Sequence, residues 1–162
     1  MTMSFFIYKY LCMNKKMPKF WAKAKKELKR KDKKLGKIID SYPKDFLFSK
    51  SDPFITLARS IVGQQISVKA AQSVWDKLVL KIDKITPKKL IITHSNTLKS
   101  AGLSYQKVSY LKNLSYAFMN KNIQFKTLEK MSDEEIIKNL TRVKGIGRWT
   151  AEMFLIFNLC RA

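Results

Sequence analysis

The chain has 162 residues, of which 46% are hydrophobic, enough for one globular domain with a buried core, and this excludes a disordered chain. Lysine and arginine number 33 against 12 acidic residues, so the formal net charge at neutral pH is +21. An anionic partner relieves such an imbalance, which favours nucleic acid first and an anionic membrane surface second. An A·T-rich genome with many lysine codons would give the same charge, so charge alone indicates only polyanion binding.

Residues 1–12 are apolar and aromatic but are interrupted by Lys9. They lack the basic start and the small-residue cleavage site of a signal peptide and are too short to span a membrane. We therefore expect an uncertain leader over residues 1–16 and one domain over residues 17–162. The two cysteines, Cys12 and Cys160, are far apart in the chain, so we expect no metal and no other cofactor.

The first expected helix lies in the Lys-rich segment that follows the leader. Hydrophobic residues recur there at helical spacing and predict one amphipathic helix with a cationic face, ended by Tyr42-Pro43: Phe20, Ala24, Leu28, Leu35 and Ile39. Asp52-Pro53 then predicts an N-cap with proline at the first helical position, and a helix that runs to Gly63. Ser67 predicts the next N-cap. Its helix should bury one stripe of side chains: Val68, Ala71, Trp75 and Leu78.

Later capping signals predict further short elements. Thr86-Pro87 opens a helix through Ile91, and Gly102 stops the turn 98–101. His94, the only histidine, is interpreted as a loop or cap residue rather than a catalytic one. A long helix should follow Ser104, with an apolar face of Val108, Leu111, Leu114 and Phe118.

Near the C-terminus, Ser132 and Glu135 have the spacing of a capping box, which predicts a helix that ends near Leu140. No segment alternates as a strand does, so the sequence predicts an all-α fold of about eight helices joined by short turns.

The most informative segment is a turn with two glycines between this helix and a strongly apolar one, Lys144-Gly145-Ile146-Gly147-Arg148. The glycines permit a tight turn with positive φ and leave backbone N–H groups accessible. Together with the positive end of the next helix, these amides make a site for a phosphate. Ile146 should anchor the turn in the core, while Lys144 and Arg148 add charge. The same pattern also occurs at ordinary helix corners.

Three segments, in order along the chain, resemble the 3-methyladenine DNA glycosylase II (alkyladenine glycosylase) branch of the helix-hairpin-helix DNA glycosylase superfamily: 52–71, 102–108 and 144–153. The resemblance covers roughly residues 20–157. It implies a multi-helix, all-α glycosylase fold and removal of alkylated purines from double-stranded DNA in base-excision repair, as part of the response to DNA damage. A monomer in a bacterial-type cytoplasm, associated with the nucleoid, is the expected setting.

The resemblance also implies roles for single residues. Gln65, with Gln64 beside it, falls where the family carries a side chain that wedges into the minor groove beside a flipped nucleotide. The alternative for both is capping of loose backbone groups at a helix end. In the hairpin, Thr150 joins the DNA-binding residues already named.

Trp149 lies where lyase-competent branches carry a nucleophilic lysine, so the resemblance implies a monofunctional hydrolase of the N-glycosidic bond. Its ring suits a cationic alkylated base, and Met153 one turn later would line the same base pocket. The alternative for both residues is core packing, which is the stronger interpretation for Met153.

The family's catalytic aspartate stabilises positive charge on the sugar, and its position lies beyond Ala162, together with the final helices. We therefore expect this chain to contain no catalytic residue and to be inactive by itself. Glu152 is a poor substitute, because it should point elsewhere from its place one turn into the last helix. The alternative function is a non-enzymatic, basic helix-hairpin-helix module that binds DNA.

Overall fold

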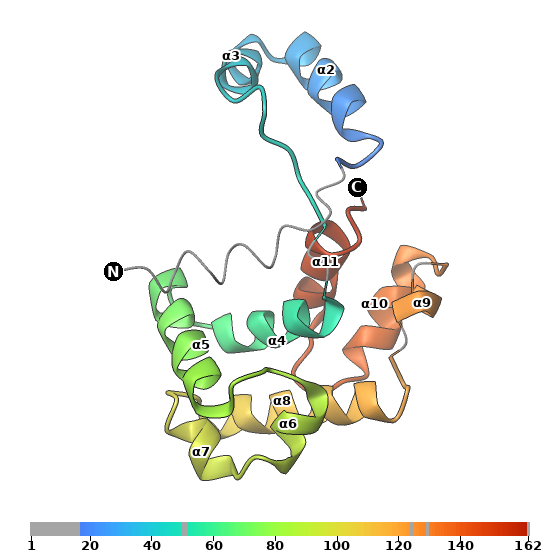
Figure 1. The fold of residues 1–162 in the computed structure, drawn as a ribbon. Coiled ribbons are helices and arrows are strands. Elements are labelled where there is room, and N and C mark those ends of the chain that lie inside the picture. The colour runs from blue at the N-terminus through green and yellow to red at the C-terminus, as the bar shows by residue number, and fades with distance from the viewer. Residues whose placement is uncertain (1–16, 50–51, 124, 129, 162) are drawn as a thin grey trace. The chain divides into compact units, whose positions relative to one another are not determined.

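The computed structural model describes residues 17–49, 52–123, 125–128 and 130–161, and every regular element in these ranges is a helix (Figure 1). This confirms the predicted all-α fold. The leader 1–16 and Cys12 lie outside the described residues. The chain divides into two compact units, one of residues 1–51 and 155–162 and one of residues 52–154.

In the first unit, helices α2 (Trp21–Lys31) and α3 (Lys33–Ser41) pack against each other. The prediction of one continuous helix here was wrong. Asp32 breaks it: its backbone is extended, and its side chain accepts hydrogen bonds from the N–H groups of Lys34 and Leu35. Because an aspartate can satisfy the free amides of a new helix, it ends one helix and starts the next. The predicted end is confirmed, since Tyr42 is the C-cap of α3.

The second unit begins with α4 (Pro53–Gly63), α5 (Val68–Ile82), α6 (Pro87–Ile92), α7 (Ser95–Lys99) and α8 (Tyr105–Met119). Helix α8 packs against α4, α6 and α7, and α5 packs against α4 and α7. The core of this second unit contains side chains with no exposed area: Leu57, Ile61, Leu78, Leu111 and Leu114. Burial of each such side chain favours folding by about 1.5–3 kcal/mol.

The predicted caps of this unit are confirmed. Asp52, Ser67 and Ser104 each accept a hydrogen bond from a backbone N–H of the helix that follows. His94 is likewise the N-cap of α7 and accepts from the N–H of Asn96. One member of the predicted α5 stripe was wrong: Val68 is 89% exposed, because it occupies the first position of the helix and faces away from the core.

The remaining helices are α9 (Phe125–Leu128), α10 (Asp133–Thr141) and α11 (Arg148–Phe157). The capping box of α10 is confirmed, with Ser132 and Glu135 each bonded to the other's backbone N–H. Helix α10 ends one residue after the predicted Leu140, and six residues separate it from α11.

Candidate nucleic-acid interface

The turn between α10 and α11 is anchored by two buried side chains. Val143 is 8% exposed and Ile146 is 4% exposed, and the N–H of Ile146 donates to the carbonyl of Val143 at 2.9 Å. The predicted anchoring role of Ile146 is therefore confirmed. With these side chains facing inward, the backbone between them and the start of α11 forms the outer edge of the turn.

The two glycines of this turn have different surroundings. Gly145 has φ +105°, and a Cβ added to it would lie 2.3 Å from Cγ of Tyr110 on α8. Both the backbone conformation and the packing therefore require glycine. Gly147 has no positive φ. Among the described residues beyond its immediate neighbours, none comes within 4 Å of a Cβ placed on Gly147. The backbone at Gly147 is thus open to a ligand at the N-terminus of α11, where helical amides lack partners within the helix.

The charges around the turn are partly paired. Lys144 is exposed. The Arg148 guanidinium, which is also exposed, donates to Glu134 on α10 at 2.7 Å and to Glu152 on α11 at 2.9 Å. The hydrogen bond that Arg148 donates to Glu134, followed by the one it donates to Glu152, raises the pKa of Arg148 above its usual value. Thr150 is only 4% exposed, so its hydroxyl group is not accessible at the surface.

A second turn, between α4 and α5, carries the two predicted wedge glutamines. Gln65 is exposed and has φ +58°, a left-handed conformation that is uncommon for residues other than glycine. Gln64 is half-buried, and its Nε2 donates to the carbonyl oxygen of Gly145 at 2.9 Å. Gln64 thus bonds a backbone carbonyl of the hairpin turn rather than a group at the end of its own helix. Gln65 is left as the candidate wedge.

Helix α8 contacts both turns. Nζ of Lys107 donates to the carbonyl oxygen of Val62, in the last turn of α4, at 2.7 Å, and partial burial lowers the pKa of this lysine. Tyr110, one turn further along α8, packs against Gly145. The lysine side chain thus satisfies one of the free carbonyls at the end of α4.

The candidate base-pocket residues lie on α11. Trp149 is 67% exposed, so the alternative that it packs in the core was wrong. Met153 is half-buried rather than buried. This ring exposes two thirds of its surface next to the turn that could bind a phosphate, so it is available to stack on a base. The carboxylate of Glu152, which lies between these two residues in the sequence, is occupied by Arg148.

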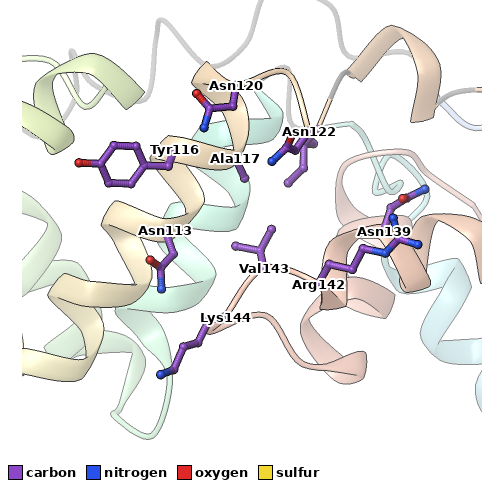
Figure 2. A pocket seen from close by; sticks show the side chains of 10 residues that line it. Asn113, Tyr116, Ala117, Asn120, Asn122, Asn139, Arg142, Val143 and Lys144 are labelled. Atoms are coloured by element: carbon purple, nitrogen blue, oxygen red, sulfur yellow. The ribbon is translucent and has the colours of Figure 1, made fainter.

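A cavity of about 600 Å³ adjoins the hairpin on the side of α8 and α10 (Figure 2). Its floor includes the buried residues Ala117, Ile123 and Val143, and its walls carry four asparagines, a tyrosine, Arg142 and Lys144. Figure 2 shows Asn139 and Arg142 on one side of this space and Asn120 and Asn122 on the other. This cavity was not predicted from the sequence. The one signal for it was the recurrence of asparagine around the end of α8.

No helix among the described residues is both long and apolar enough to cross a membrane. Within the same residues, no three histidine, cysteine or acidic side chains are grouped so as to hold a metal ion.

The fold and the site define a class: an all-helical protein that presents a helix-hairpin-helix turn, a second glutamine-bearing turn and an exposed tryptophan. The family model described as "HhH-GPD superfamily base excision DNA repair protein" matches residues 58–155. The chain therefore belongs to the HhH-GPD superfamily of base excision DNA repair proteins.

Two curated yeast relatives are similar in sequence. DNA-3-methyladenine glycosylase 1 of Schizosaccharomyces pombe is 33% identical over 133 residues, which cover 80% of this chain and 58% of that protein. DNA-3-methyladenine glycosylase of Saccharomyces cerevisiae is 41% identical over 123 residues, covering 68% of this chain and 40% of that protein. The chain thus spans about half the length of the curated relatives it matches.

Solved structures show the same fold. The 3-methyladenine DNA glycosylase of S. pombe in complex with abasic DNA has a TM-score of 0.76 and 33% identity, with 86% of this chain and 71% of that chain covered. A DNA-3-methyladenine glycosidase from Bacillus halodurans has a TM-score of 0.71 and 32% identity, covering 83% of this chain and 63% of that one. The Clostridium acetobutylicum 8-oxoguanine glycosylase/lyase, at 19% identity, shares the fold alone.

Proposed function

We propose that this chain forms the DNA-engaging part of a monofunctional glycosylase that hydrolyses the N-glycosidic bond of alkylated purines of the 3-methyladenine type in double-stranded DNA. The observation that carries the proposal is the hairpin turn with an open backbone at Gly147, followed directly by the exposed ring of Trp149. A phosphate held at the first of these sites brings the DNA strand close to the second. The names of the yeast relatives support the choice of lesion.

Each element then has a distinct task. The hairpin amides and Lys144 hold backbone phosphate, which positions the DNA without reading its sequence. Gln65 enters the gap left when the damaged nucleotide leaves the base stack. Trp149 stacks on the cationic base by a cation–π interaction. Because an indole has no amine, it forms no Schiff base with the sugar, and the product is an abasic site in an uncleaved strand.

The proposal concerns a single chain on duplex DNA. Two of the relatives are yeast proteins, so a bacterial-type cytoplasmic setting is not part of it. The second candidate function, a non-enzymatic DNA-binding module, is favoured by one observation: Glu152, the only carboxylate in α11, is paired with Arg148. The two candidates differ in whether they recognise a lesion.

The test compares two matched duplexes, one undamaged and one with a tetrahydrofuran abasic analogue. A lesion-engaging protein binds the analogue at least about tenfold more tightly, because unstacking costs least where a base is missing. Trp149→Ala and Gln65→Ala should each reduce that preference. Equal affinity for the two duplexes would leave only the non-enzymatic module.

Trapping with borohydride tests the monofunctional mechanism separately. With a duplex that contains a natural abasic site, whose sugar aldehyde is present without prior base excision, the chain should give no covalent adduct, while the C. acetobutylicum glycosylase/lyase on the same duplex provides the positive control. A covalent adduct formed by this chain would contradict the role assigned to Trp149.

A further inference from the structure

The side chain of Gln64 joins the two turns that the proposed function assigns to DNA. Its Nε2 donates to the carbonyl oxygen of Gly145 at 2.9 Å, across 81 positions of the sequence. The next residue, Gln65, is the exposed candidate wedge and has φ +58°. The bond therefore links the base of the wedge turn to the first glycine of the hairpin.

The surroundings restrict where either turn can move. On one side, Lys107 holds the end of α4 through the carbonyl oxygen of Val62 at 2.7 Å. On the other, Tyr110 of the same helix packs against Gly145 so closely that a Cβ there would clash at 2.3 Å. Helix α8 thus contacts the end of α4 and the hairpin turn, and the side chain of Gln64 forms a direct hydrogen bond between the two turns.

We propose that Gln64 is a positioning residue that fixes the distance between the minor-groove wedge and the phosphate-binding hairpin. The inference rests on the proposed function, because it assigns Gln65 to the wedge. With the bond in place, a phosphate held at the hairpin sets the depth at which Gln65 meets the base stack. Without this hydrogen bond, each turn still contacts DNA, but the distance between the two contacts is no longer fixed.

The chemistry of this bond provides a specific test. The amide of Gln64 acts as a donor, and Glu in its place has nearly the same shape but, when ionised, presents only acceptors to the Gly145 carbonyl. Two oxygens that face each other repel, so Gln64→Glu should open the link at neutral pH. A protonated carboxyl group regains a donor O–H, so the link should close again in acid. The partly buried position and the nearby carbonyl should raise the pKa of this carboxyl above that of a free glutamate, so mild acid should restore the donor.

The experiment measures affinity for the abasic-analogue duplex relative to undamaged duplex, at about pH 7.5 and about pH 5. Gln64→Glu should lose about tenfold of this preference at the higher pH, as expected for the loss of one hydrogen bond and repulsion between its partners. It should recover most of the preference at the lower pH. Its affinity for undamaged duplex should change much less, since the hairpin and the lysines remain.

Gln72→Glu provides the matched control. It makes the same chemical change on α5, where Gln72 is exposed and bonded to Arg59 and Asp76 rather than to either turn, and it should keep the preference at both pH values. Gln64→Met, which removes the donor without adding charge, should lose preference at both pH values and serves as the second variant if Gln64→Glu does not fold.

The outcomes separate the two proposals. A parent chain without preference for the abasic analogue contradicts the proposed function. A parent with that preference and a Gln64→Glu variant that keeps it at neutral pH overturns the positioning role alone. The same conclusion follows if the variant loses its preference and acid does not restore it.

Discussion

At the scale of single residues, the hairpin glycines differ in a way that their sequence pattern does not reveal. Gly145 is constrained by its φ of +105° and by Tyr110, whereas the backbone at Gly147 is open. The sequence predicted a tight turn with positive φ and accessible amides; the structure gives the positive φ to the first glycine and the open approach to the second. The two glycines differ because α8 packs against the first of them. Since α8 lies more than twenty residues away along the chain, the local sequence does not show this difference.

The two glycines should therefore respond differently to alanine. Gly145→Ala should destabilise the fold by at least about 1–2 kcal/mol, because it forces a left-handed conformation on a residue with a Cβ and also meets Tyr110. Gly147→Ala should leave stability within about 0.5 kcal/mol of the parent but weaken DNA binding about tenfold, since the methyl group stands where a phosphate would approach. Urea denaturation and DNA titration of both variants check this. An unchanged DNA affinity of Gly147→Ala would make the turn an ordinary corner.

Arg148, a predicted DNA-binding residue, is paired with two carboxylates in the structure. The sequence predicted that Arg148 adds positive charge beside the hairpin, and in the structure Glu134 and Glu152 both pair with its guanidinium. Glu134 comes from the first turn of α10, so this pairing follows from the approach of two helix ends that no local pattern encodes.

Removal of Glu134 should therefore strengthen DNA binding. Glu134→Gln deletes a negative charge near the phosphate site and releases Arg148 from its shorter contact, so we expect affinity to rise about two- to fivefold at low salt, with the gain shrinking as salt screens the charges. Asp76→Asn removes the same charge from α5 and should give a smaller gain. Equal effects of the two variants would mean that only net charge matters.

At the scale of elements, capping residues made most of the helix boundaries predictable. Asp52, Ser67, Ser104 and Ser132 each carry their own local signal, because a side chain that bonds the first amides acts within three or four residues. The signal of Asp32 was hidden in a lysine-rich run whose apolar spacing continues through the break. Contacts such as Gln64–Gly145 join distant segments, so one sequence without its fold cannot reveal them.

The capping box of α10 makes a prediction about pH. Hydrogen bonds from the backbone N–H and the hydroxyl group of Ser132 lower the pKa of Glu135. A carboxyl group whose pKa is lower in the folded state stabilises the fold above its unfolded pKa, and this contribution is lost as the pH falls through the folded value. Glu135→Ala should therefore be less stable than the parent at neutral pH, and the difference should shrink in acid.

Urea denaturation from neutral pH to about pH 3 measures this difference across the range in which Glu135 titrates. Glu135→Gln is the control, since glutamine can keep the capping geometry without titrating. A stability difference between Glu135→Ala and the parent that stays constant down to the lowest pH would show that the carboxylate contributes through packing alone.

At the scale of the whole molecule, the net charge of +21 indicates how the chain meets DNA. Phosphate contacts release condensed counterions, so the logarithm of the binding constant should fall linearly with the logarithm of salt concentration. With about five to eight contacts, the slope for duplex DNA should lie between about −4 and −7, with little dependence on sequence. Titrations at several salt concentrations, with two unrelated duplexes and with anionic vesicles as the competing polyanion, measure both properties. A DNA affinity that does not change with salt concentration, or vesicle binding as tight as DNA binding, would contradict the prediction that the positive charge binds DNA through phosphate contacts.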